Sequence, residues 1–307
     1  MSQPMILEPR DITALRLAET RPFYFQDPLL TSAGFTLTEY RQRLNRLTTA
    51  GIIRSFHLTL FIPPLLGGNW VWAGIMTRAD QPYETAHQLI DRIPFITEIL
   101  FNTCFPANLG PNLALLLFSR DLETETRFIQ TLPGVRETQV FKINEYPFPV
   151  SLPLSGEEKA LIRFLLQHPD TDAETIAANF GQSLNWVRAK LDRLLWTQDN
   201  RNGIIRIQPS INWSNAENFG HFHFLLETGY RPDQLAPLIA DHNFTLIMSG
   251  TLISNRYLGV EADVWGIADL FQRLEFLEHL HGVRVAALIY NQEVLINDHW
   301  VSRTIGA

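Results

Sequence analysis

Basic side chains recur at matching positions in two distant segments of the sequence. Residues 36–54 read TLTEYRQRLNRLTTAGIIR, and residues 182–206 read QSLNWVRAKLDRLLWTQDNRNGIIR. Lysine and arginine groups of this kind can neutralise phosphates, so the first chemistry to consider is contact with a nucleic-acid backbone. A shift of 147 positions makes three basic pairs coincide: Arg41 with Arg188, Arg43 with Lys190, and Arg46 with Arg193.

The element that positions these groups is an amphipathic helix. The same shift aligns the apolar residues, whose spacing of three and four residues marks one helix face. These residues are Leu37, Tyr40, Leu44 and Leu47 in the first segment and Leu184, Val187, Leu191 and Leu194 in the second. The letters GIIR close both segments, and a further GVR match at 134–136 and 282–284 has an offset of 148. A period of about 150 residues indicates a duplicated pair of domains rather than a solenoid.

Composition and charge limit the class of protein. The chain has 307 residues, a net charge of −7 and one cysteine, Cys104, which excludes a disulfide framework and a cysteine-rich zinc site. Residues 58–76 carry no charge, but Pro63-Pro64 and Gly67-Gly68 interrupt any helix there. The first residues do not resemble a signal peptide. We therefore expect a soluble, cytoplasmic protein with no membrane segment.

Each half begins with a predicted winged helix-turn-helix. In the first half we expect a helix near Asp11–Thr20, a short helix after Asp27-Pro28, a third from Thr36 to about Ala50, and a strand from Ile52 to Phe61. Thr36 and Glu39 fit a capping box. In the second half the matching helices are expected over 156–168 and 172–179 and from residue 183 onward, before a strand at 204–207.

A second pattern follows each of these units. Residues 69–77, 82–93, 96–105, 113–118, 121–132 and 135–144 read as β-α-β-β-α-β, and 221–228, 231–241, 245–252, 256–262, 264–280 and 284–290 repeat that order. This order predicts a ferredoxin-like αβ-sandwich. The fold class is therefore α+β, with winged helix-turn-helix domains at 1–62 and 151–212 and ferredoxin-like domains at 63–150 and 213–307. Their net charges are +2, 0, −3 and −6 respectively, so the helix-turn-helix units are the least acidic parts.

With this architecture the chain resembles the leucine-responsive regulator/AsnC ("feast/famine") transcription factors, as a tandem duplication. The residues that carry the resemblance are the R-L-x-R-L…G-I-I-R run at 43–54, its counterpart at 190–206, and L-P-G-V-R-x-T at 132–138. The resemblance implies RAM-type sensor domains, double-stranded DNA and a possible small-molecule effector as partners, and a homo-oligomer. Because family members usually carry one copy and dimerise, it also implies an intramolecular pseudo-dimer.

The third helix of a helix-turn-helix enters the major groove, so its outward residues are the candidate DNA contacts. An ordinary solvated helix face is the alternative explanation for the same residues. Arg43 and Arg46 fit a bracing role or phosphate contact better than base reading. The candidates are Thr36, Thr38, Arg41, Gln42 and Asn45 in the first half and Ser183, Asn185, Trp186 and Arg188 in the second.

The effector site implied by the resemblance lies at two strand turns, at Asn108 and Gly110 and at Gly250 and Asn255. Both turns depart from the family's Gly-then-Asp pattern, which argues against a free amino acid as the effector. His221 and His223 alternate on one strand and could ligate a metal, but such histidines more often lie on a sheet surface. We predict no catalytic residue, no metal and no cofactor.

Transcriptional regulation through DNA binding is therefore the leading hypothesis. The first alternative is an enzyme resembling the siroheme decarboxylases, which share the architecture, although their His-Asn-Tyr-x-Arg signature does not occur in this sequence. Another small-molecule binder on the same fold is also open. The remaining alternative is a protein-interaction module whose helices do not touch DNA.

Overall fold

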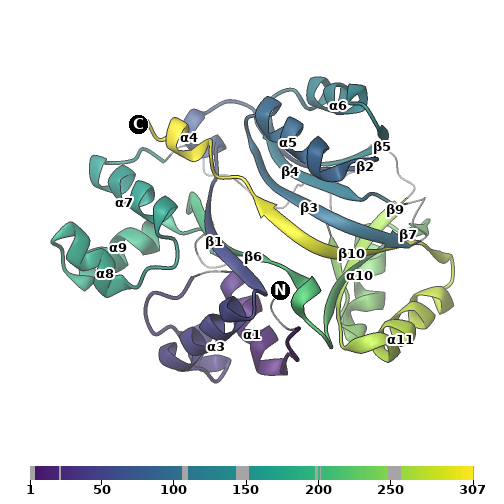
Figure 1. The fold of residues 1–307 in the computed structure, drawn as a ribbon, viewed down its shortest axis with the longest axis horizontal. Coiled ribbons are helices and arrows are strands. Elements are labelled where there is room, and N and C mark those ends of the chain that lie inside the picture. Colours follow the sequence, from purple (N-terminus) through teal and green to yellow (C-terminus); the bar gives the residue numbers. More distant parts are fainter. Residues whose placement is uncertain are drawn as a thin grey trace.

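A computed structural model of the chain describes residues 4–20, 22–105, 110–142, 152–197, 200, 202–247 and 257–306 (Figure 1). It has the α+β architecture expected from the sequence, with two winged helix-turn-helix units and two ferredoxin-like units in tandem. Among the described residues, no helix is long and apolar enough to cross a membrane.

The first helix-turn-helix unit forms where the sequence places it. It comprises α1 (Pro9–Thr20), α2 (Pro28–Ser32), α3 (Leu37–Thr49) and β1 (Ile53–Leu60). Thr36 and Glu39 make the expected capping box at the start of α3, so two otherwise unpaired backbone amides are satisfied. After α3 the chain turns through Gly51, which has a positive φ of 72°.

The second unit has the same order: α7 (Gly156–Gln167), α8 (Ala173–Phe180), α9 (Leu184–Leu194) and β6 (Ile205–Ile211). Strands β1 and β6 pair with each other in an antiparallel ribbon, in which Leu60 lies opposite Ile205. The two units are thus joined through equivalent strands, as expected of a pseudo-dimer within one chain.

The two ferredoxin-like units form one antiparallel sheet of eight strands in the order β5-β2-β4-β3-β10-β7-β9-β8. Each set of four has the strand order expected of that fold. The first half supplies β2 (Val71–Ala79), α5 (Pro82–Arg92), β3 (Ile96–Phe105), β4 (Leu113–Ser119), α6 (Leu122–Thr131) and β5 (Val135–Lys142). The second supplies β7 (Gly220–Thr228), α10 (Pro232–Ile239), β8 (Thr245–Ile247), β9 (Tyr257–Val264), α11 (Gly266–His279) and β10 (Val283–Ile296).

The two sheets meet edge to edge, through β3 and β10. We expected each sheet to cover the other, because each has an apolar face. Instead, α5, α6, α10 and α11 cover one face of the continuous sheet with two apolar cores. Part of the other face lies against the β1–β6 ribbon and α1, which places the polar residues of that face in the interior (Figure 1).

The C-terminal strand differs most from the sequence prediction. It was expected over 284–290 but continues to Ile296, because residues beyond 290 pair with β3 of the first half. The chain then packs Trp300 against the first half, where its indole Nε1 donates to the Ile96 carbonyl oxygen at 3.1 Å. The last short helix, α12 (Val301–Thr304), joins the core around the second helix-turn-helix unit.

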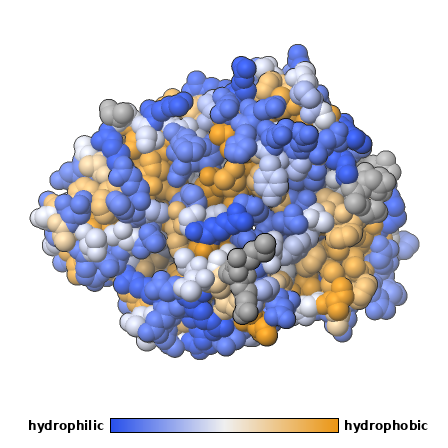
Figure 2. Space-filling model, viewed as in Figure 1, coloured by the Kyte–Doolittle hydropathy of each residue, from blue (hydrophilic) through white to orange (hydrophobic). Residues whose placement is uncertain are grey.

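Short helical pieces also lie outside the predicted elements. The Pro63-Pro64 pair does not exclude a helix; it begins α4 (Pro63–Leu66), since proline is compatible with a first helical turn. Two 3₁₀ turns, η1 (Trp213–Asn215) and η2 (Ala240–His242), flank strands of the second half. On the surface, hydrophobic residues gather on the right-hand side of Figure 2. Helix α11 exposes Ile267 and Phe271.

Candidate functional site

The basic residues of the two matched helices mostly pair with carboxylates of their own units. Arg43 bonds to Glu8 at 3.1 Å and to buried Asp11 at 2.7 Å. Arg46 contacts the same two carboxylates. In the second half, Lys190 and Arg193 likewise pair with Glu157 and Glu158 of α7. The matched basic pattern therefore has a bracing role, as expected for Arg43 and Arg46.

Arg41 and Arg188, the remaining pair, both contact aromatic residues at the junction of the units. Arg41 donates to the Tyr24 carbonyl oxygen at 3.4 Å and lines a groove of about 260 Å³ with Asp170 and Asp172 of the second unit. The guanidinium of Arg188 lies 4.2 Å from the ring centroid of Phe25. Arg188 is exposed, whereas Arg41 is half-buried, although both were expected on an exposed side.

The other predicted DNA contacts divide into capping, packed and exposed residues. Thr36 and Ser183 are N-caps of α3 and α9. The ring of Trp186 packs against Phe180 at a centroid distance of 5.6 Å. Both N-caps are also exposed, as are the remaining residues Thr38, Gln42, Asn45 and Asn185. A polar outward surface is therefore present on both helices, but its exposed basic charge is sparse.

Of the four predicted effector residues, Gly110 alone lies among the described residues. Asn108, Gly250 and Asn255 lie outside the described residues. Gly110 is buried, and a Cβ atom there would lie 2.6 Å from the Cβ of Cys104. Close packing against Cys104 thus accounts for this glycine.

A cavity of about 360 Å³ lies between the open face of the sheet and the β1–β6 ribbon. Its volume is in the range of small-molecule sites. Both halves supply apolar walls, among them Trp72, Met76 and Leu116 from the first and Ile211 and Ile289 from the second. A row of polar residues crosses the sheet floor, consisting of Asn102, Asn291, His221, His223 and Glu261.

Three donor atoms of this row converge. The Nε2 atoms of His221 and His223 lie 3.1 Å apart. The Glu261 Oε2 atom lies 3.5 Å from the first and 3.7 Å from the second. The two histidines are buried and Glu261 is half-buried, and antiparallel pairing of β7 with β9 sets His223 directly opposite Glu261.

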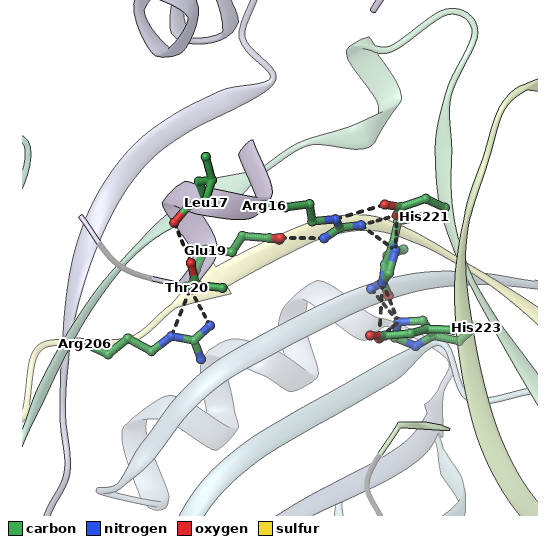
Figure 3. Close-up of polar contacts among 10 residues, drawn as sticks. Arg16, Leu17, Glu19, Thr20, Arg206, His221 and His223 are labelled. Atoms are coloured by element: carbon green, nitrogen blue, oxygen red, sulfur yellow. Dashed lines mark hydrogen bonds and ion pairs between the residues drawn. The ribbon is translucent and has the colours of Figure 1, made fainter. Parts of the chain in front are cut away.

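Helix α1 holds this cluster from the first half of the chain (Figure 3). The Arg16 guanidinium forms a two-point contact with Asp263, donating from Nε to Oδ2 at 3.0 Å and from Nη2 to Oδ1. Asp263 Oδ1 lies 2.9 Å from His221 Nδ1. Glu19, one turn along α1, accepts from Arg16 Nη1 at 2.5 Å. These contacts fix the orientation of the His221 ring.

The two histidines have opposite electrostatic environments. Burial alone lowers the pKa of His221, but hydrogen bonds with Asp263 and Glu261 outweigh it and raise the pKa to about 9. Burial and the neighbouring charge of His221 lower the pKa of His223 to about 3. Burial raises the pKa of Asp263, but contacts with His221 and Arg16 lower it to about 2. A charged and a neutral imidazole therefore lie side by side in the cavity wall.

Two amide oxygens in the same wall have no hydrogen-bond partner among the described residues. They are the Oδ1 atoms of Asn102 and Asn291, which are opposite each other in the β3–β10 pair. Their side chains are at least nine-tenths buried, with exposed fractions of 8% and 4%. The Nδ2 atom of Asn291 lies 3.2 Å from His223 Nε2. Buried polar atoms are rarely left unpaired in folded proteins, so these acceptors mark the wall as a binding surface.

Sequence reasoning singled out His221 and His223 but missed the residues that complete the cluster. Glu261 and Asp263 alternate on β9 as the histidines do on β7. An H-x-H strand beside an E-x-D strand is a signal that the predicted strand order could have revealed. Arg16 and Asn102 belong to the first half, so their approach to the second half depends on the joining of the halves, which no local pattern records. Asn291 lies just beyond the strand predicted over 284–290.

Comparisons with known proteins show similarity of fold alone. No protein-family profile matches the sequence, and no curated protein matches it. Among solved structures, the siroheme decarboxylase NirDL is 16% identical over 92% of this chain and 91% of its own, with a TM-score of 0.48. Its complex with an iron-uroporphyrin III analogue is 13% identical over 96% of both chains, with a TM-score of 0.49.

Single-copy regulators match half of the chain. AsnC of E. coli is 16% identical over 48% of this chain and 99% of its own, with a TM-score of 0.28. A transcriptional regulator of Neisseria meningitidis in complex with L-Met is 22% identical over 48% of this chain and 97% of its own, with a TM-score of 0.29. Because every TM-score quoted is below 0.5, the proposals below rest on the geometry of this chain.

Proposed function

We propose that this protein binds a small molecule in the central cavity, and that its activity is exerted there. The observation that carries the proposal is the pair of buried, unpartnered amide oxygens of Asn102 and Asn291 in the wall of a 360 Å³ cavity. Leaving a buried acceptor unpaired costs about 1–3 kcal/mol. A ligand that donates hydrogen bonds to both oxygens would recover this cost on binding.

The walls indicate the character of the ligand. Apolar lining residues include Trp72, Leu116 and Trp213. Polar groups lie on the sheet floor and, on the opposite side, at Glu19 of α1 and at Arg206 and Gln208 of β6. This combination suits a molecule with substantial apolar surface and a few N–H or O–H groups. Since the lining comes from both halves, binding depends on the duplicated chain as a whole.

Leucine substitutions test the proposal because they separate binding from folding. Asn102→Leu and Asn291→Leu keep the branched shape of the side chain and remove an unpaired acceptor. Asn102→Leu should therefore not lower the free energy of unfolding, whereas Asn291→Leu also loses the contact with His223 and should lower it by less than the control below. Binding should be lost in both variants. Binding is measured by native mass spectrometry for a co-purified molecule and by thermal shift with a panel that includes the twenty amino acids and an iron-uroporphyrin III analogue.

A matched control is Asn297→Leu. Asn297 is equally buried, but its amide donates to the Ile96 carbonyl oxygen at 3.0 Å. Its loss should lower the free energy of unfolding by about 1–3 kcal/mol. If Asn102→Leu and Asn291→Leu destabilise the protein as much as the control, and ligand binding is unchanged, the cavity is not the binding site.

The thermal-shift panel also separates finer alternatives. Stabilisation by the iron-uroporphyrin III analogue, with a new absorbance band, would support an enzyme resembling the siroheme decarboxylases. Stabilisation by an amino acid would support an effector-sensing role. Either outcome would mean that the chain binds a small molecule, and the two outcomes differ in the chemical class of that molecule.

DNA-binding regulation is the second candidate, and the placement of α3 and α9 favours it. The β1–β6 ribbon joins their two units through equivalent strands, and both helices present exposed polar residues. Such a pair would read two half-sites about one helical turn, or a multiple of it, apart. Electrophoretic shift of selected DNA across a salt titration tests it, with Arg188→Ala expected to reduce the salt slope by about one unit if Arg188 contacts a phosphate.

We further propose that the chain assembles into at least a homodimer, as the family resemblance implies. Light scattering at micromolar concentration measures the mass directly. A single species near the chain mass of 35.2 kDa would overturn this part of the proposal.

A further inference from the structure

We propose that His221, His223 and Glu261 form a binding site for a divalent transition metal, with Zn²⁺ as the ion that fits best. The site lies where the central cavity meets strands β7 and β9. It deepens the proposed function, because the ion would lie within the same ligand cavity. Its existence, however, can be tested without any small-molecule ligand.

The spacing of the three donor atoms is the first support. Zn²⁺ binds imidazole nitrogens and carboxylate oxygens at about 2.0–2.1 Å, so donors at tetrahedral positions lie about 3.3–3.5 Å apart. The separations of His221 Nε2, His223 Nε2 and Glu261 Oε2 are 3.1, 3.5 and 3.7 Å. An ion can therefore be placed among them with shifts of a few tenths of an ångström.

The surroundings of His221 are the second support. Metal-bound histidines usually donate their other ring nitrogen to a carboxylate or carbonyl oxygen, which fixes the ring and its tautomer. Here His221 Nδ1 lies 2.9 Å from Asp263 Oδ1. Asp263 is itself held by Arg16 at two points. When Nδ1 keeps its proton toward Asp263 and a metal ion displaces the proton on Nε2, the Nε2 lone pair faces the site.

Charge gives a third, independent argument. A metal ion would displace the second ring proton of His221, so both imidazoles would be neutral in the occupied site. The carboxylates of Glu19, Glu261 and Asp263 and the guanidinium of Arg16 then sum to two negative charges. One divalent cation neutralises them. The carboxylates are half-buried and close together, so their mutual repulsion favours a dication among them.

The three donor groups also restrict which ion can bind and leave one of its coordination positions open. Two imidazoles and one carboxylate match catalytic zinc sites and non-haem Fe²⁺ sites, whereas Mg²⁺ and Ca²⁺ prefer all-oxygen sites. The remaining position would face the cavity, where Asn291 lies 3.2 Å from His223 Nε2. Asn291 must release that contact on metal binding and can then hydrogen-bond to a water or ligand atom on the ion.

The experiment uses the tag-free full chain, stripped with a chelator and titrated calorimetrically with Zn²⁺ alone. One Zn²⁺ per chain is expected. His223→Gln and Glu261→Gln should each weaken binding about 100-fold or more, and Asp263→Asn about 10–100-fold. His87→Gln is the matched control, because His87 is exposed on α5 and should leave affinity unchanged.

A second measurement on the unaltered chain keeps the test independent of variant folding. X-ray absorption of the zinc-loaded protein should show two imidazole nitrogens in the first coordination sphere, and Co²⁺ should give a visible d–d band. No Zn²⁺ binding by the folded parent, or undiminished binding by folded His223→Gln and Glu261→Gln variants, refutes the metal site. Zinc binding without any small-molecule binding instead refutes the proposed function and leaves the metal site intact.

Discussion

At the scale of single residues, the glycines of the two GIIR copies have different structural roles. Gly51 follows α3 with a positive φ of 72°, which favours glycine. Gly203 does not have a positive φ, but a Cβ atom there would lie 2.2 Å from the Leu195 backbone. The duplicated glycine therefore ends a helix in one half and permits a close backbone approach in the other.

Alanine substitutions should separate these two reasons. Gly51→Ala should lower the free energy of unfolding by about 1 kcal/mol, the cost of a left-handed alanine. Gly203→Ala should cost more, since the backbone of Leu195 cannot move aside as a flexible side chain could. Urea unfolding of both variants measures the difference. A smaller loss for Gly203→Ala than for Gly51→Ala would contradict the packing explanation.

Glu158 should make stability depend on pH. Burial raises its pKa, but hydrogen bonds from Arg193 and the Ser155 amide outweigh this and lower the pKa from 4.5 to about 2. Because the folded-state pKa lies below the unfolded one, the contribution is complete above about pH 4.5 and is lost as the pH falls toward 2. Glu158→Gln should therefore lower the free energy of unfolding by about 2–3 kcal/mol at pH 7, with a difference that narrows in acid.

Glu157 provides the control for this prediction. It is the neighbouring residue, its side chain is 57% exposed, and it pairs with Lys190 at 3.1 Å. An exposed pair of this kind contributes about 0.2–1 kcal/mol. Equal losses for Glu157→Gln and Glu158→Gln, or a Glu158→Gln loss that does not vary between pH 7 and pH 3, would show that burial of Glu158 is not the cause.

At the scale of elements, local signals recovered most helices and strands. The capping box at Thr36 and the apolar spacing of the third helices depend on residues only a few positions apart, and the structure contains the box and both helices. The extension of β10 to Ile296 was missed, because its stabilising partner is β3, nearly 200 residues away. A sequence window contains the strand but not the neighbour that lengthens it.

The candidate site was likewise predicted where the signal is local and missed where distant segments meet. The sequence pointed to His221 and His223 through their alternation, and β-strand geometry then places both on one face. Whether that face is solvated or enclosed depends on the β1–β6 ribbon and α1, which cover it from elsewhere in the chain. The expectation that these histidines lie on a sheet surface considers a single domain. It does not consider the neighbouring units, which cover that surface.

At the scale of the whole molecule, the halves share structure at several places. Strands β1 and β6 form one ribbon, β3 and β10 form one sheet, and Arg16 of the first half holds Asp263 of the second. Separation would expose the edges of β3 and β10 and remove the partner of each ribbon strand. Unpaired edges of that kind are poorly tolerated in isolated domains.

We therefore expect the full chain to unfold in a single cooperative transition, and its halves to depend on each other. Produced separately, residues 1–150 and 151–307 should be unstable or aggregate, whereas co-expression should return a one-to-one complex that retains the cavity. Differential scanning calorimetry of the full chain and co-purification of the halves measure the two effects.

Val294 offers a sharper perturbation, since it lies opposite Leu100 in the β3–β10 pair. Val294→Pro should weaken the co-purified complex because proline removes an amide donor and distorts a central strand. Val71, which begins β2 and pairs with Ser119 rather than across the halves, is the comparison site: Val71→Pro should leave the association of the halves largely unchanged. Two separately stable halves, or a complex equally tolerant of both prolines, would mean that the duplication produced two independent units instead of one molecule.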